Sequence, residues 1–337
     1  MTKPRAAQIA AAIVIAAAFT LTSASAESVK IRAGWVVAPA SLIPLLFAKP
    51  GLAKHQGKSY VFDPVYIPAS PIQITALAAG ELDIAALGFS SFPFAVQNAG
   101  LSDLRIIAAE IQDGGGDGFS TQFMVRKDAG IGTVADLRGK VVAVNGVGTG
   151  VHMAVQAMLQ KHGLQDRRDY TVIEAPFPTM KAVLLERKAD LAVLTTPFVF
   201  DPELQDKART LFTQKEAMGT SELSFWTARQ GFLAKNRAAM VDLLEDSLRA
   251  LDWYLNPANR KEAIDLVAAL LKQPRARFES WIFTKNDFHR DRDGLVDLDA
   301  LQTNVNLMRQ LGILTSDLQV AGCADLSLVR EASQRLK

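Results

Sequence analysis

The turn formed by Gly146-Val147-Gly148-Thr149-Gly150 contains the residues whose chemistry is easiest to interpret. It follows an apolar segment, Lys140–Val144, and precedes an apolar-rich stretch that ends at Lys161. A glycine-rich turn at a helix start exposes backbone N–H groups, and the helix dipole favours a negative charge there. Thr149 adds a hydroxyl that can donate to an anion or cap the helix. The turn therefore predicts either an anion site or an ordinary tight strand-to-helix connection.

Known catalytic and phosphate-binding motifs do not fit the sequence. Val151 breaks the GxGxxG dinucleotide pattern at this turn, and no Lys-Ser/Thr pair follows it as in a P-loop. No GxSxG or HExxH signature occurs. Cys323 is the only cysteine, and no Cys/His cluster has zinc-site spacing. We expect no catalytic residues, no bound metal and no cofactor.

Further candidate binding residues stand where predicted strands end, because ligands of α/β folds bind beyond the carboxyl ends of the strands. By this rule the candidates are Trp35, Ser41, Ser70, Phe89, Ser90, Ser91, Thr195 and Thr196. Each has a structural alternative: the aromatic residues could pack in the core, and the serines could cap helices. Trp226, next to Phe225, could equally form an aromatic wall or pack in the core.

Strand-like and helix-like segments alternate along the chain and must position these residues. Strands are predicted at 29–36, 60–67, 82–87, 104–109, 121–126, 140–144, 170–174, 191–194 and 224–232. Helical segments are predicted at 41–55, 70–79, 91–99, 134–137, 150–161, 178–187, 237–254, 260–271, 278–284 and 298–311. Short strands separated by helices of about ten residues are typical of parallel βαβ units.

The predicted segments form two βα sets and a helical C-terminal tail. We expect an α/β protein of two lobes, with the chain crossing between them near 112–121 and 217–227. The first lobe would comprise residues 27–115 and 222–337, and the second lobe residues 116–221. The glycine-rich stretch Asp113–Phe119 at the first crossing is a candidate hinge or cleft edge.

The N-terminal residues 1–26 have the layout of a secretory signal peptide. Lys3 and Arg5 precede an apolar run, Ile9–Thr20, and the small residues Ala24-Ser25-Ala26 follow. The run of about a dozen residues is too short to span a bilayer permanently. The first mature residue would be Glu27 and not a cysteine, so no lipid anchor is expected. These features predict export to the periplasm.

Without this leader the chain is formally neutral. Removing Lys3 and Arg5 from the 37 basic residues leaves 35, which equals the 35 acidic residues. Neutrality argues against a nucleic-acid partner, which usually requires a basic surface. A single cysteine excludes an internal disulfide, so the fold depends on its own core. We expect a soluble monomer.

Three stretches carry a resemblance to a known family: Pro71–Gly100 with AAGELDIA, residues 134–163 with DLRGK and VAV, and Leu184–Arg209 with ADLAVL. In this order and spacing the chain resembles the periplasmic substrate-binding proteins of ABC transporters for sulfonates, nitrate and taurine. That group also contains binding proteins for thiamine-precursor pyrimidines. The resemblance implies the type II periplasmic-binding-protein fold, in which each lobe is a mainly parallel sheet flanked by helices. It also implies a ligand bound between closing lobes and delivered to a membrane permease.

The resemblance extends to individual residues. His152 is similar to the family's histidine after the glycine turn, although a histidine early in a helix is often a structural hydrogen-bonder. Thr195-Thr196-Pro197-Phe198 matches a segment that often reads Trp-Asp-Pro-aromatic, with both the aromatic and the acidic residue replaced by Thr. The missing acid disfavours an amino-sulfonate and suits a simple anion or an amphipathic molecule. We expect a non-catalytic binder of a small organic anion. The alternatives are a binder of a neutral heterocycle such as a thiamine-precursor pyrimidine, an exported enzyme on the same fold, and a sensor.

Overall fold

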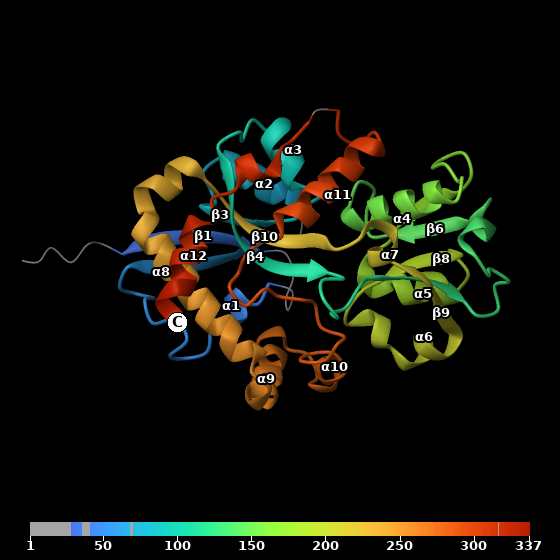
Figure 1. The fold of residues 1–337 in the computed structure, drawn as a ribbon. Coiled ribbons are helices and arrows are strands. Elements are labelled where there is room, and N and C mark those ends of the chain that lie inside the picture. Colours follow the sequence, from blue (N-terminus) through green and yellow to red (C-terminus); the bar gives the residue numbers. More distant parts are fainter. Residues whose placement is uncertain (1–27, 36–40, 68–69, 316) are drawn as a thin grey trace, which may run out of the picture.

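Two five-stranded sheets, each with its own helices, lie side by side in the structure (Figure 1). The computed structural model describes residues 28–35, 41–67, 70–315 and 317–337. The first sheet has the order β2-β1-β3-β10-β4, with β1 (Val29–Trp35), β2 (Tyr60–Tyr66), β3 (Ile84–Leu87), β4 (Leu104–Asp113) and β10 (Ser221–Arg229). The second has the order β7-β6-β8-β5-β9, with β5 (Gln122–Arg126), β6 (Val141–Val144), β7 (Thr171–Glu174), β8 (Leu191–Leu194) and β9 (Ala208–Thr213). The predicted signal peptide lies outside the described residues.

Each sheet is covered by helices, and we call each sheet with its helices a lobe. The helices of the first lobe are α1 (Ile43–Leu46), α2 (Ser70–Ala78), α3 (Phe92–Gln97), α8 (Gln230–Leu255), α9 (Arg260–Leu271), α10 (Ala276–Glu279), α11 (Leu298–Gln310) and α12 (Ser327–Leu336). Those of the second lobe are α4 (Gly150–Lys161), α5 (Met180–Leu185), α6 (Pro202–Lys207) and α7 (Gln214–Met218). In the second lobe α4 and α7 pack together, while α5 and α6 lie on the other side of the sheet (Figure 1).

The strand directions confirm the predicted fold class. In the first sheet β1 pairs in parallel with β2 and β3, and only β10 runs against its neighbours. In the second sheet β6 pairs in parallel with β7 and β8, and only β5 is antiparallel. In each lobe the antiparallel strand is the first strand along the chain after it crosses from the other lobe: β5 follows the first crossing, and β10 follows the second. Both sheets are therefore mainly parallel and share one topology.

The chain passes between the lobes through two short connections, at 114–121 and 219–220. In the first, the buried Asp113 carboxylate accepts hydrogen bonds from the Ser120 hydroxyl at 2.6 Å and from the Thr121 N–H at 2.9 Å. The Phe119 N–H donates to the Asp287 carbonyl of the first lobe, and Lys215 of α7 donates to the Gly116 carbonyl. The glycine-rich segment is thus tied to both lobes.

Several sequence predictions about the elements are wrong. The helix predicted at 41–55 is the single turn α1, because Pro50 and Gly51, with a φ of 85°, end the helical stretch. The strand β9 and the helices α6, α7 and α12 were not predicted. The helix predicted at 278–284 is instead the short α10, which ends at Glu279 and is followed by turns. The last strand ends at Arg229 and α8 begins at once, and the predicted helix start at residue 237 coincides with a kink at Asn236.

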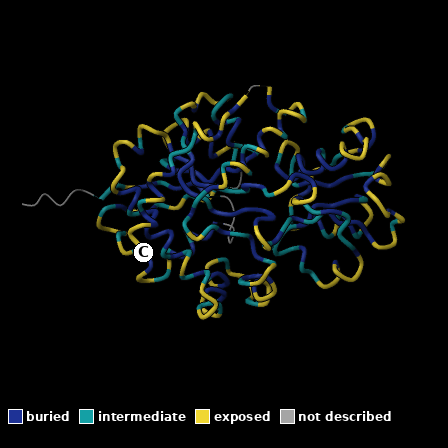
Figure 2. The backbone as a smooth tube through the Cα atoms, in the orientation of Figure 1, coloured by how far each residue is buried: buried dark blue, intermediate teal, exposed yellow. Residues whose placement is uncertain are grey.

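Buried residues follow the strands and the inner sides of the helices in both lobes (Figure 2). One hydrophobic cluster extends through both lobes, and a smaller one lies among α1, α8, α9 and α10. Within the described part of the chain, no helix combines the length and apolar character needed to cross a bilayer.

Candidate functional site

The glycine turn before α4 forms as predicted, and the protein itself uses several of its hydrogen-bonding groups. The Val147 N–H donates to Glu174 Oε1 at 2.5 Å, and the Gly148 N–H donates to His152 Nδ1 at 3.0 Å. Thr149 is the N-cap of α4: its hydroxyl accepts from the His152 N–H at 3.4 Å and lies 2.7 Å from the Gly146 carbonyl oxygen. A carboxylate of the chain therefore already occupies one face of the turn.

His152 is buried, and burial lowers the pKa of its imidazole, which favours the neutral form. Because Nδ1 accepts from Gly148, the ring proton resides on Nε2. That atom is buried 3.8 Å from Asp166 Oδ2 and has no hydrogen-bond partner among the described residues. This geometry supports the structural interpretation of His152, as the group that holds the turn.

The two lobes meet where Phe89 lies against the first residue of α4. Phe89 follows β3 in the first lobe and is 1% exposed. A Cβ added to Gly150 would lie 2.7 Å from Phe89 Cζ, so the ring packs directly on the backbone of the second lobe. The N–H groups of Gly150 and Val151, at the start of α4, have no backbone or side-chain acceptor in the described structure. Helix donors of this kind attract anions.

Glu174 at the end of β7 belongs to this junction and was missed from the sequence. Its residue type gave no signal, because a glutamate after a strand usually faces solvent. The position of Glu174 in the chain did give a signal. Because β7 pairs in parallel with β6, the carboxyl ends of both strands lie at the same edge of the sheet. Applying the strand-end rule to residue 174 would have found it.

Several predicted site residues make no contact with this junction within the described part of the chain. The Trp35 ring packs on Tyr66, with 4.9 Å between centroids, and its buried Nε1 has no partner among the described residues. The Ser91 hydroxyl bonds to the backbone of Gly88 and does not cap α3. The remaining residues of this set are partly exposed and lie at the start of α2, before α3 and after β8: Ser70, Ser90, Thr195 and Thr196. Ser70 is the first residue of α2 and not its N-cap.

Trp226 and Glu110 line a cavity of about 40 Å³ in the first lobe, and the buried Ser41 lies next to Glu110. The cavity lies between the strands β4 and β10 and the helices α8 and α12. Trp226 lines it and is 4% exposed. Trp226 is a buried core residue, and its ring also forms part of the wall of this cavity.

Glu110 is a buried carboxyl group that the sequence did not single out. The Ser224 hydroxyl donates to its Oε2 at 2.5 Å, and its Oε1 has no partner among the described residues. Burial raises the pKa of Glu110 to about 7, against the opposing effects of Ser224 and Arg290. Glu222 on β10 is similar: burial raises its pKa to about 7, and Gln112 donates to its Oε1 at 2.5 Å.

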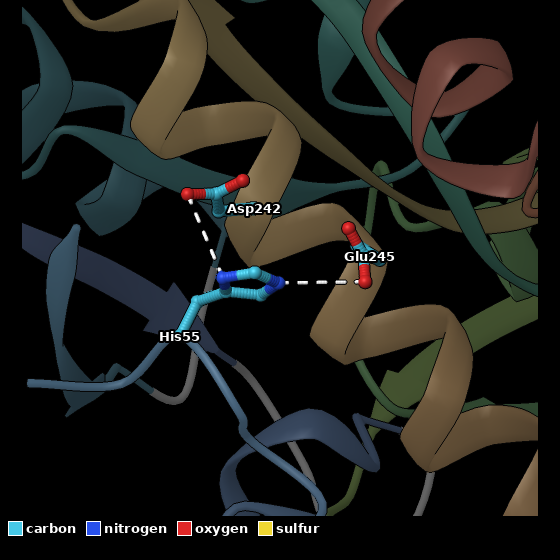
Figure 3. A group of neighbouring side chains, drawn as sticks. All are labelled: His55, Asp242 and Glu245. Carbon is cyan, nitrogen blue, oxygen red and sulfur yellow. Dashed lines mark ion pairs between the residues drawn. The ribbon is translucent and has the colours of Figure 1, made fainter. Parts of the chain in front are cut away.

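One group of described side chains has ligand types that a metal accepts: His55, Asp242 and Glu245, whose ligand atoms lie within 4.8 Å of one another (Figure 3). Asp242 faces Nδ1 of the ring at 3.8 Å, and Glu245 faces Nε2 at 3.4 Å. A single ion could use only one of these nitrogens. Arg335 also pairs with Asp242 at 2.9 Å, and Arg249 with Glu245 at 2.5 Å. The cluster therefore forms ion pairs that attach the segment before β2 to α8.

Comparison with known proteins agrees with this architecture. Residues 56–217 match the family model described as "ABC transporter, phosphonate, periplasmic substrate-binding protein". No curated protein sequence matched the chain.

Among solved structures, the aliphatic sulphonate binding protein SsuA of Escherichia coli is 21% identical, with a TM-score of 0.69 over 88% of this chain and 97% of that one. The nitrate-binding protein NrtA of Synechocystis PCC 6803 is 16% identical, with a TM-score of 0.69 over 92% and 90%. The desulfurization enzyme DSZB is 15% identical, with a TM-score of 0.66 over 92% and 100%. At these identities the likeness establishes the fold, and the fold occurs in binding proteins and in an enzyme.

The resemblance inferred from the sequence is confirmed at the level of the fold. The matching family model is that of phosphonate transporters, whereas the resemblance was drawn to the sulfonate, nitrate and taurine group. The chain thus has the fold of the periplasmic binding proteins, and its residues 56–217 match the substrate-binding proteins of ABC phosphonate transporters.

Proposed function

We propose that this protein is the extracytoplasmic solute-binding component of an ABC importer, and that it captures a small organic anion between its two lobes. The junction of Phe89 and Gly150 carries the proposal. There the two lobes touch at the start of α4, beside two backbone N–H groups that have no acceptor among the described residues. A sulfonate, phosphonate or carboxylate group fits such donors. The family match at 56–217 supports the transporter role.

The proposal includes the boundaries and location predicted from the sequence. Residues 1–26 would be a signal peptide without a lipid anchor. Residues 27–115 and 222–337 would move as one lobe and residues 116–221 as the other. The partner would be a membrane permease that binds transiently, and the protein itself would be a monomer without catalytic activity.

An exported enzyme remains the principal competing function, because a desulfurization enzyme has the same fold. Cys323, the sole thiol, lies in the first lobe, and burial raises its pKa, which opposes a reactive thiolate. The Thr149 hydroxyl donates to the Gly146 carbonyl, and the His152 imidazole accepts from the Gly148 N–H. The hydroxyl and the imidazole therefore do not form a nucleophile–base pair in this structure. These observations favour binding over catalysis.

A thermal-shift screen tests the proposal. The panel comprises alkylphosphonates, alkanesulfonates, nitrate, aliphatic and aromatic carboxylates, and pyrimidines. A ligand of the native state raises the melting temperature in proportion to the logarithm of its concentration over its Kd. We expect an organic anion to stabilise the protein and to be recovered unchanged. Stabilisation by pyrimidines alone would favour the heterocycle alternative, turnover of a hit would favour an enzyme, and no hit at all would contradict the binding function.

A further inference from the structure

The lobes make a second contact beside α6, apart from the junction of Phe89 and Gly150. It joins α10 of the first lobe to the turn Phe198–Phe200, which connects β8 to α6 in the second lobe. The guanidinium carbon of Arg277 lies 5.2 Å from the centroid of the Phe198 ring, within the roughly 6 Å range of a cation–π contact. The helix α10 thus extends from the first lobe toward α6 (Figure 1).

Phe200 adds an apolar contact at the same place. Its side chain is partly buried and packs against the smaller hydrophobic cluster, all of whose buried members belong to the first lobe. The Phe200 ring also lies 6.0 Å from that of Phe119 in the first connection, and Phe119 lies 5.5 Å from Phe288 of the first lobe, both measured between centroids. Separating the lobes would return this apolar surface to water, which is unfavourable.

The two sides of this contact are each anchored in their own lobe. In the second lobe Asp201, the residue after Phe200, is the N-cap of α6 and pairs with Lys181 of α5 at 2.8 Å. In the first lobe the carbonyl of Arg277 accepts a hydrogen bond at 3.1 Å from the indole of Trp281, which is 1% exposed. Neither side can follow the other when the lobes separate unless it gives up these bonds.

We propose that Arg277, Phe198 and Phe200 form a clasp that holds the two lobes closed and so sets how often the solute site opens. The inference rests on the proposed closure of the lobes around a solute, and adds a device that controls that closure. The clasp shares no residue with the glycine turn, so it acts on the equilibrium between open and closed forms. Weakening it lowers the fraction of closed molecules and, with it, the apparent affinity for a solute that the closed form binds.

Double electron–electron resonance on the solute-free protein tests the clasp. Spin labels are attached at Thr75→Cys in α2 and Lys188→Cys after α5, in a Cys323→Ser background that removes the sole native cysteine. Both labelled positions are exposed, and they lie in different lobes. The distance distribution between the labels therefore gives the ratio of open to closed molecules.

We expect Arg277→Ala to raise this ratio about two- to fivefold, the range that an exposed cation–π contact provides. Arg275→Ala is the matched control. Arg275 adjoins the same helix, but its acidic partners, Asp265 and Glu279, both belong to the first lobe. Its removal should leave the ratio unchanged.

The partner ring gives a second, independent measurement. Phe198→Ala should raise the ratio as much as Arg277→Ala, and the double variant should add little to either, because both changes remove one contact. Phe200→Ala should have the largest effect, since it removes the apolar contact. If that variant does not fold, Arg277→Ala decides, because the Arg277 side chain is exposed and its loss leaves the core intact.

Equal ratios in wild type and Arg277→Ala, or fully additive effects of Arg277→Ala and Phe198→Ala, would overturn the inference. A wild-type protein that is open throughout, or an open form that none of the variants reveals, would also overturn it. Because no solute is present, these outcomes leave the proposed binding function untouched. Conversely, a solute screen without a hit would contradict that function and not the clasp.

Discussion

The two lobes share one strand topology but fill the space around their antiparallel strand in opposite ways. In the second lobe Phe123 of β5 and Phe212 of β9 are stacked, with 4.5 Å between centroids and 13° between planes. In the first lobe the corresponding strands, β10 and β4, carry the buried Glu222 and Glu110 and border a cavity. The second lobe thus shows that this topology needs no buried carboxyl.

The comparison between the two lobes shows which side chains the shared strand topology requires and which it can do without. Buried carboxyls destabilise a folded protein unless they are fully paired. Glu110 and Glu222 each leave one buried oxygen without a partner among the described residues. Since an apolar pair satisfies the same topology elsewhere in the chain, the strand topology does not require the glutamates of the first lobe.

The largest effect is expected from placing a carboxyl in the second lobe. Phe212→Glu would bury a charge beside Phe123 with no partner provided, and should cost at least about 4 kcal/mol in the free energy of unfolding at pH 8. Phe212→Leu, which keeps an apolar side chain, is the control and should cost less. Urea denaturation measures both. Equal stability of the two variants would remove the contrast between the lobes.

Removing a buried carboxyl from the first lobe should alter how the free energy of unfolding depends on pH. Burial raises the pKa of Glu110 and of Glu222 from 4.5 to about 7, so the folded state holds these protons more tightly than the unfolded state. Each group therefore favours folding fully below pH 4.5, and this contribution is lost as the pH rises from 4.5 to 7. The loss is about 3 kcal/mol for each group.

Urea denaturation at pH 4.5 and pH 7 measures that loss. Glu110→Gln and Glu222→Gln should each reduce the pH dependence of wild-type protein, because glutamine does not ionise. The exposed Glu81→Gln is the control and should leave it unchanged. A wild-type stability that rises between pH 4.5 and 7 would contradict this assignment.

The junction of the lobes should be sensitive to a single methyl group. The Cβ of Gly150→Ala would stand 2.7 Å from Phe89 Cζ and would keep the lobes from meeting as they do here. We expect a loss of solute affinity of about tenfold, or about 1.4 kcal/mol, with the best ligand of the screen. Gly231→Ala in α8 is the control, since nothing lies within 4 Å of its added Cβ. Unchanged affinity of Gly150→Ala would exclude this junction from closure.

The smallest effect is expected at the turn of the second lobe. Thr149→Ala removes the N-cap hydrogen bond to His152 and should cost about 1 kcal/mol of stability without unfolding the protein. It should also weaken binding of an anion, whereas Thr149→Ser, which keeps the hydroxyl, should do neither. Calorimetry and thermal denaturation measure the two effects. Undiminished affinity in Thr149→Ala would remove this turn from the site.

Elements with strong local signals could be predicted from the sequence. The helix α9 and the strand β8 begin and end at the predicted residues. Their apolar patterns and flanking polar residues are local properties of the chain. The strand β9 was missed because Ala208–Thr213 mixes arginine and threonine with apolar residues. Among the described strands, β9 lies at the sheet edge and pairs with β5 alone. Pairing with β5 defines this edge strand, and such pairing is not local information.

The candidate site was predictable only where it lies at strand ends. The glycine turn, the Thr149 cap and the position of Phe89 follow from the strand-end rule. Glu110 could not be found this way, because it lies within a strand and its partner Ser224 is 114 residues away. Its importance arises from burial and from cross-strand neighbours, which exist only once the sheet has formed.

The connection around Asp113 has a consequence for the rate at which the protein exchanges solute. Its carboxylate is buried, and the Phe119 N–H and Lys215 attach the same loop to the first and second lobe. Separating the lobes would strain or break these hydrogen bonds. The open state should therefore be less populated than in a protein whose connecting segment makes no such bonds. A captured solute would then have a long residence time. Its discharge would depend less on spontaneous escape than on a partner that pulls the lobes apart at the membrane.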